Sequence, residues 1–248
     1  MKKSFQLLVI LMVFLINPFS AWPQEKIRVA VAANFVRAFK EIAERFEAKT
    51  GVKVEATFTS SGNLYSQIIN GAPYDLFLSA DKERPARLHK DGLGEEPFVY
   101  AGGRVVLWSA RKDFCRSRDW QKALKDGRIK KIAIANPLTA PYGAATKTAL
   151  QKAGLWDALQ PRLVNAQDVA QSFQYASTGA VEAGFCSLSV TSTPQGQSGC
   201  FLAIPEAPAI NQFACLLKST KNQGTVKRFA AFLLSSEADQ IKRKFGYR

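Results

Sequence analysis

The sequence predicts an α/β protein of two lobes, each built on a mixed, mostly parallel sheet with helices on both faces. Short apolar strands alternate with amphipathic helices along most of the 248 residues, which is the order that builds such sheets. Gly102-Gly103 and the segment near Lys218 interrupt this order, and there the chain is expected to cross between lobes. These crossings assign residues 26–103 and 219–248 to lobe 1, and residues 104–218 to lobe 2.

The N-terminal residues 1–21 have the features of a secretory signal peptide. Lys2 and Lys3 precede an apolar run from Phe5 to Ile16, and the following segment ends in the small residues Ser20 and Ala21. This run is too short to cross a bilayer comfortably, which takes about 20 residues. We therefore expect cleavage near Ala21 and export of the mature protein to the periplasm.

In lobe 1, the spacing of apolar residues predicts a first strand, and the flanking residues Asn34 and Gly51 predict where the first helix begins and ends. Ile27, Val29 and Val31 alternate along a first strand that ends in Ala32-Ala33. A helix from Asn34 to Gly51 follows, with Asn34 as its expected N-cap. The remaining expected elements are a strand at 52–58, a helix at 64–69, a strand ending at Ser79 and a helix from about Pro85 to Asp91.

Beyond residue 97, the expected elements are shorter and separated by turn-forming residues. Strands are expected at 98–110, 131–136, 162–164, 184–188, 200–204 and 213–217, with a loop at 191–199. Helices are expected at 120–125, 144–153, from 169, at 222–235 and from 238 to about 245. The two C-terminal helices are expected to return to lobe 1.

The charge balance favours a small anion as ligand. The chain carries 34 Lys and Arg against 20 Asp and Glu, a formal charge of +14. These basic residues are dispersed rather than gathered in runs, and export argues against nucleic acid as a partner.

Four cysteines, Cys115, Cys186, Cys200 and Cys215, permit three disulfide pairings in an exported chain. Cys200–Cys215 is the first expectation, because both lie on strands joined by the loop at 205–208. A single histidine and the absence of a C-x-x-C motif argue against a zinc site.

Four turns share one pattern, in which a strand ends and a helix begins. They are Ala33-Asn34, Ser60-Ser61-Gly62, Pro141-Tyr142-Gly143 and Gln167-Asp168-Val169. In open α/β sheets, ligands bind beyond the carboxyl ends of strands, and each helix N-terminus carries roughly half a positive charge. None of the four turns contains Lys or Arg, so they predict an oxyanion site made of neutral donors.

Each of these residues also has a purely structural interpretation. Asn34 and either Ser60 or Ser61 are suited to cap their helices, Val169 suits a core position, and the Tyr142 side chain suits a wall.

The turns and one further segment resemble the periplasmic molybdate-binding proteins of ABC transporters. The resemblance rests on Ala32-Ala33-Asn34-Phe35, Phe58-Thr59-Ser60-Ser61-Gly62 and Asn70-Gly71-Ala72-Pro73-Tyr74-Asp75-Leu76-Phe77-Leu78-Ser79-Ala80-Asp81. It implies the two-lobed type II periplasmic binding protein fold. It also implies that Asn34 and Ser61 donate from lobe 1, and that Tyr142 and Val169 donate backbone N–H groups from lobe 2. Ala33, Ser60 and Ser187 are further candidates; Ser187 lies near the strand from which some family members supply a tyrosine.

The function that this resemblance implies is capture of molybdate, and also tungstate, for delivery to an ABC permease in the inner membrane. It further implies a monomer without a resident cofactor, in which molybdenum is present only as bound molybdate. The alternatives are another tetrahedral oxyanion (sulfate, phosphate or chromate) or a sensory module for oxyanions. An exported hydrolase is disfavoured because the sequence offers no Ser/His/Asp arrangement and no metal cluster, so the chain is not expected to be an enzyme.

Overall fold

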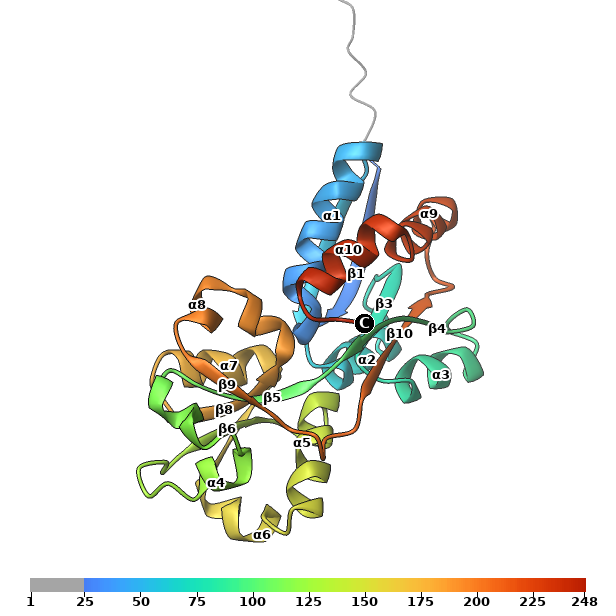
Figure 1. Cartoon of the computed structure of the whole chain (residues 1–248). Coiled ribbons are helices and arrows are strands. Elements are labelled where there is room, and N and C mark those ends of the chain that lie inside the picture. The colour runs from blue at the N-terminus through green and yellow to red at the C-terminus, as the bar shows by residue number, and fades with distance from the viewer. Residues whose placement is uncertain (1–24) are drawn as a thin grey trace, which may run out of the picture.

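The computed structural model describes residues 25–248, and the predicted signal peptide at 1–21 lies outside the described residues. Two lobes are visible, each with a five-stranded sheet, one above the other in Figure 1. In each sheet, two strand pairings are parallel and two are antiparallel. The sheets are therefore mixed, as the sequence predicts, but they are not mostly parallel.

Lobe 1 contains the sheet with strand order β2-β1-β3-β10-β4. Its strands are β1 (Lys26–Ala32), β2 (Lys53–Thr59), β3 (Leu76–Ser79), β4 (Phe98–Gly103) and β10 (Ile210–Leu216). Its helices are α1 (Val36–Thr50), α2 (Ser61–Ile69), α3 (Glu83–Lys90), α9 (Gln223–Leu233) and α10 (Ser236–Lys244), with the short 3-10 helix η1 (Ala33–Phe35) before α1.

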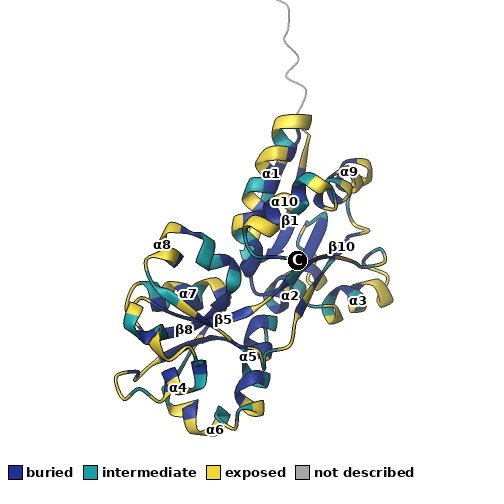
Figure 2. Ribbon diagram, viewed as in Figure 1, coloured by how far each residue is buried: buried dark blue, intermediate teal, exposed yellow. Residues whose placement is uncertain are grey.

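Alternation along β1 explains how helices cover both faces of this sheet. Ile27, Val29 and Val31 face one side and pack in a core with residues of α1, α9 and α10. Ala30 faces the other side and packs with residues of α2 and α3. The C-terminal helices therefore do return to lobe 1, as expected, and Figure 2 shows the buried strands between the two helical layers.

Lobe 2 contains the sheet with strand order β7-β6-β8-β5-β9. Its strands are β5 (Val105–Ser109), β6 (Ile132–Ala135), β7 (Leu163–Ala166), β8 (Ala183–Ser187) and β9 (Cys200–Ala203). Its helices are α4 (Trp120–Leu124), α5 (Pro141–Lys152), α6 (Trp156–Leu159), α7 (Val169–Ser177) and α8 (Pro194–Gln197), with 3-10 helices η2 (Lys112–Ser117), η3 (Gln160–Arg162) and η4 (Leu188–Ser192). The segment expected to be a loop at 191–199 thus contains the end of η4 and all of α8.

The chain crosses between the sheets twice. The first crossing runs from Gly103 at the end of β4 to Val105 at the start of β5. The second lies between β9 and β10, upstream of the boundary expected near Lys218, because β10 pairs with β3 and β4. The strand β10 therefore belongs to lobe 1. Its pairing with β3 and β4 is a long-range contact that the local sequence of the strand does not encode.

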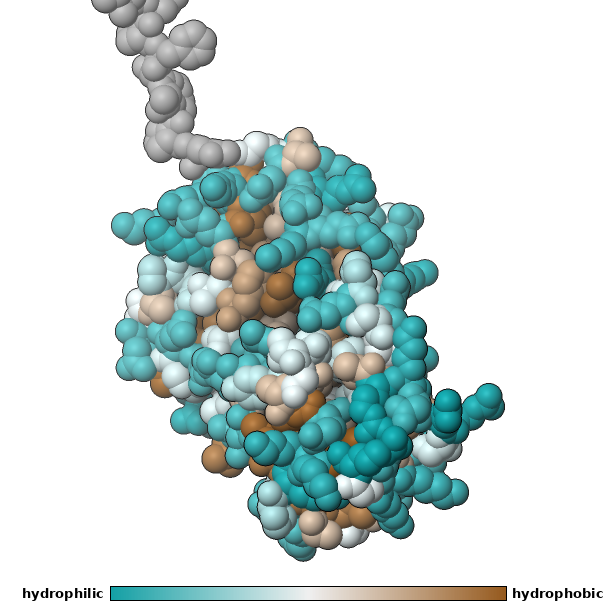
Figure 3. All heavy atoms as spheres, turned by 90° about the vertical axis from the view of Figure 1, so that its left-hand side faces the viewer, coloured by the Kyte–Doolittle hydropathy of each residue, from teal (hydrophilic) through white to brown (hydrophobic). Residues whose placement is uncertain are grey.

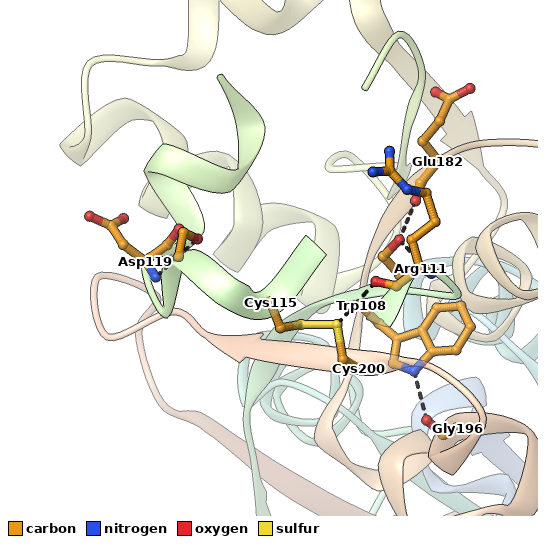
Figure 4. Close-up of a disulfide and its surroundings, with 9 residues drawn as sticks. Trp108, Arg111, Cys115, Asp119, Glu182, Gly196 and Cys200 are labelled. Atoms are coloured by element: carbon orange, nitrogen blue, oxygen red, sulfur yellow. Dashed lines mark hydrogen bonds between the residues drawn. A yellow bond between two sulfur atoms is a disulfide. The ribbon is translucent and has the colours of Figure 1, made fainter. Parts of the chain in front are cut away.

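The disulfide joins Cys115 of η2 to Cys200 of β9, so the expected Cys200–Cys215 pairing is wrong (Figure 4). Cys200 and Cys215 lie on strands of different sheets, whereas β9 lies beside η2 within lobe 2. Cys186 and Cys215 are buried free thiols.

The described residues contain no helix that is long and apolar enough to cross a membrane. Figure 3 shows one face of the molecule, on which hydrophilic residues predominate and hydrophobic surface is confined to separate smaller areas.

Candidate functional site

The four predicted turns converge on one small cavity between the lobes. Its lining residues are Ala32, Ala33, Asn34, Ser60, Ser61, Ala80, Ala140, Pro141, Tyr142, Asp168 and Val169. Among the described residues, no Lys or Arg lines this cavity. The structure therefore brings together Asn34, Ser61, Tyr142 and Val169, with Ala33 and Ser60 beside them.

Asn34 does not cap its helix, contrary to the structural interpretation of the sequence. It lies in η1, and the N-cap position of α1 is Phe35, without a side-chain hydrogen bond. The Asn34 amide Nδ2 instead donates to Gln212 Oε1 at 2.8 Å and to Tyr247 Oη at 3.3 Å. These bonds hold the buried Asn34 side chain against Gln212 and Tyr247 instead of the helix end.

The two serines of the second turn, Ser60 and Ser61, accept hydrogen bonds from different parts of lobe 1. Ser60 is the N-cap of α2, and its Oγ accepts from the N–H of Asn63 at 3.3 Å. Ser61 Oγ accepts from the N–H of Ala80 at 2.9 Å. A serine hydroxyl has one proton to donate besides its acceptor sites, so Ser61 can still donate to an acceptor in the cavity. Both residues are buried.

On lobe 2, the two turns are built so that helix N-termini face the cavity. Pro141 occupies the first turn of α5, where its missing N–H costs nothing, and Ala140 offers no side-chain cap. Asp168 caps α7, its Oδ1 accepting from Ala170 N at 2.9 Å and Gln171 N at 3.0 Å. These bonds engage the Asp168 carboxylate and leave the first N–H of α7, that of Val169, outside the side-chain cap.

Ser187 does not line the cavity but lies behind Tyr142. Ser187 Oγ donates to the Tyr142 hydroxyl at 3.2 Å and lies 3.0 Å from Ser189 Oγ. Ser189 Oγ donates across the lobes to the backbone oxygen of Asn34 at 3.0 Å. Gly103 makes room for this arrangement, because a Cβ there would lie 2.1 Å from the Tyr142 hydroxyl.

Sequence reasoning missed Tyr100, Tyr247 and Gln212, which support the site from behind. Gln212 Oε1 also accepts from the Tyr100 hydroxyl at 2.9 Å. Burial raises the pKa of Tyr100, Tyr142 and Tyr247 above 10.0, so all three remain neutral at neutral pH. Gln212 follows Asn211 and lies outside the strand expected at 213–217, so no local pattern singled it out. Its partners come from distant segments.

The arrangement suits a small anion. Helix N-termini and a hydroxyl supply donors, and a neutral buried network holds them in place. Among residues 25–248, no group of three or more His, Cys, Asp or Glu side chains could hold a metal ion.

Two lobes that enclose a donor-lined cavity define the solute-binding class of protein. The family model for bacterial extracellular solute-binding proteins matches residues 27–248, and the chain belongs to this family. It is accordingly a binding protein rather than an enzyme.

Several relatives are named molybdate-binding proteins. ModA of Rhodobacter capsulatus is 40% identical over 220 residues, which cover 88% of this chain and 86% of that protein. ModA of Azotobacter vinelandii is 38% identical over 227 residues, covering 90% of this chain and 89% of that protein. The solved periplasmic molybdate-binding protein of A. vinelandii superposes with a TM-score of 0.84 at 33% identity, covering 90% of this chain and 98% of that one.

A sulfate-binding protein of Mycobacterium tuberculosis, SubI, shares the fold. Its TM-score is 0.78 at 16% identity, over 91% of this chain and 87% of that one. At this identity the likeness concerns the fold alone.

Proposed function

We propose that this protein captures molybdate, and also tungstate, in the cavity between its lobes. The observation that carries the proposal is the convergence of four strand-to-helix turns on one small cavity, which no Lys or Arg of the described residues lines. Relatives at 38% and 40% identity that are named molybdate-binding proteins support the choice of oxyanion.

In this proposal, the Ser61 hydroxyl and the backbone N–H groups of Asn34, Tyr142 and Val169 donate to the oxyanion. Hydrogen bonds to a charged acceptor contribute roughly 1.5–3 kcal/mol each. Ala33 and Ser60 shape the wall beside these donors, and Ser187 acts through its bond to Tyr142.

Selectivity follows from donors of fixed position. Sulfate has the charge and shape of molybdate but is smaller, so a ring of donors spaced for molybdate leaves some of its bonds to sulfate long. The donors are N–H and O–H groups, and the carboxylate of Asp168 is engaged in capping α7. A fully deprotonated oxyanion is therefore preferred to one that carries a proton.

We further propose that the protein is exported to the periplasm and works as a monomer that delivers its ligand to an ABC permease. It needs no resident cofactor for this role. The basic balance of the chain, +14, fits a protein that attracts small anions.

Thermal unfolding with molybdate, tungstate, sulfate, phosphate and chromate in turn tests the proposal. A ligand that binds only the folded state stabilises it by about 2.7 kcal/mol at one hundred times its dissociation constant. We expect a large rise in Tm with molybdate and tungstate, and little or none with the others. A rise with sulfate or phosphate alone would assign a different oxyanion, and no rise with any of them would refute the site.

A further inference from the structure

The lobes touch directly where the turn before α5 meets the first turn of α2. The N–H of Gly62, the second residue of α2, donates to the backbone oxygen of Thr139 in lobe 2 at 2.8 Å. Beside it, Arg84 Nη2 donates to the backbone oxygen of Leu138 at 3.3 Å. Arg84 is held on lobe 1 by an ion pair with Asp81. Backbone atoms of the 136–140 turn thus accept two hydrogen bonds from lobe 1.

Only a glycine allows this approach. A Cβ built on Gly62 would lie 2.8 Å from the Thr139 oxygen and 2.9 Å from Thr139 Cα. Both obstacles are backbone atoms of the other lobe, so no side-chain rotation can relieve the contact. Gly62 has no left-handed φ angle and lies within a helix, where alanine is the more favourable residue. Glycine at position 62 is therefore required by the contact between lobes and not by the helix.

This contact is part of the two turns that supply the donors. Ser61 immediately precedes Gly62, and Tyr142 follows Thr139 by three residues within the same turn and helix start. Seating Thr139 on Gly62 therefore sets the distance between the Ser61 hydroxyl of lobe 1 and the N-terminus of α5 on lobe 2. An error of a few tenths of an ångström here lengthens the hydrogen bonds to any anion held between them.

We propose that Gly62 is a positioning residue for ligand capture, which lets the lobes close fully and latches them through its N–H bond to Thr139. This inference rests on the proposed function, because the latch acts on the oxyanion held between the same turns. The Gly62–Thr139 bond and the Arg84–Leu138 bond exist only when the lobes are in contact. They therefore slow ligand release rather than speed ligand entry.

The test is Gly62→Ala, with Gly224→Ala as matched control. Gly224 is also the second residue of its helix, α9, and a Cβ there meets no atom within 4 Å. Stopped-flow and calorimetric binding of molybdate would give kon, koff and Kd for both variants and the wild type. For Gly62→Ala we expect koff and Kd to rise about tenfold or more, with kon nearly unchanged, since at least one hydrogen bond is lost and the donors are spread. For Gly224→Ala all three should equal the wild-type values.

A second readout separates positioning from folding. Without ligand, the Tm of Gly62→Ala should be no lower than that of the wild type, because alanine favours the helix. With saturating molybdate, small-angle scattering should show Gly62→Ala with a larger radius of gyration than the wild type. Wild-type affinity in Gly62→Ala, or a fall in its ligand-free Tm that matches its loss of affinity, would overturn the latch. A wild-type protein that binds no oxyanion would instead overturn the proposed function.

Discussion

Replacing Ser61 by alanine removes two interactions of its hydroxyl, one with the Ala80 N–H and one with the ligand, and the two losses affect different measurements. The Oγ atom accepts from the N–H of Ala80 at 2.9 Å, and its proton is free to donate to a ligand. Removing a hydrogen bond to a charged acceptor costs roughly 1.5–3 kcal/mol. At 1.4 kcal/mol per factor of ten, Kd for molybdate should therefore rise about 10- to 150-fold.

The same substitution also leaves the buried Ala80 N–H without its acceptor, which costs about 1–3 kcal/mol of folding free energy. Ser235→Ala is a suitable control, because Ser235 caps α10 through the N–H of Ala238, away from the cavity. Loss of that cap should cost about 1 kcal/mol of stability and leave Kd unchanged.

Isothermal titration calorimetry with molybdate measures Kd, and urea unfolding without ligand measures stability. A Kd for Ser61→Ala within twofold of the wild type would refute the assignment of the Ser61 hydroxyl as a ligand donor. An equal rise in Kd for Ser235→Ala would show that lost stability, rather than a lost donor, governs affinity.

Further predictions concern the cysteines. The Cys115–Cys200 disulfide joins residues 85 apart, for which the chain-entropy relation gives about 4.6 kcal/mol; the double serine variant should lose roughly 2–4.6 kcal/mol in urea unfolding and keep its Kd. Cys186 and Cys215 are buried, so a thiol reagent should label neither in the native protein and both after unfolding. Labelling of the native protein faster than it unfolds would contradict this. Burial also raises the pKa of Cys215 from 9.0 to about 12 and that of Cys186 upward as well. The thiols of the unfolded chain therefore lose their protons at a lower pH than those of the folded protein. The free energy of unfolding has its full contribution from these groups below pH 9, and this contribution is lost as the pH rises toward 12. Urea midpoints at pH 8 and pH 10 should show this decline, with a smaller one in Cys215→Ser.

The sequence by itself determined the elements and the turns, because these depend on near neighbours. The alternation of Ile27, Val29 and Val31 predicted β1 and the face that it buries. The helix expected from Val169 begins at that residue, because Asp168 caps it from one position away. The helix expected at 144–153 begins at Pro141, since a proline is compatible with the first turn. Local periodicity and turn-forming residues thus located all four strand-to-helix turns, although Asn34 does not cap its helix.

Only the tertiary structure decided which distant segments meet. Asn34 has the residue type of an N-cap. Its amide nevertheless donates to Gln212 and Tyr247, which are 178 and 213 residues away from it in the sequence. Strand β10 follows lobe 2 in sequence but pairs in the sheet of lobe 1. Cys200 had three possible partners in the sequence, and the packing of β9 beside η2 selected Cys115. Each of these outcomes depends on the difference in free energy between alternative pairings of distant segments. No local pattern of residues encodes that difference, so they emerge only when the two sheets assemble.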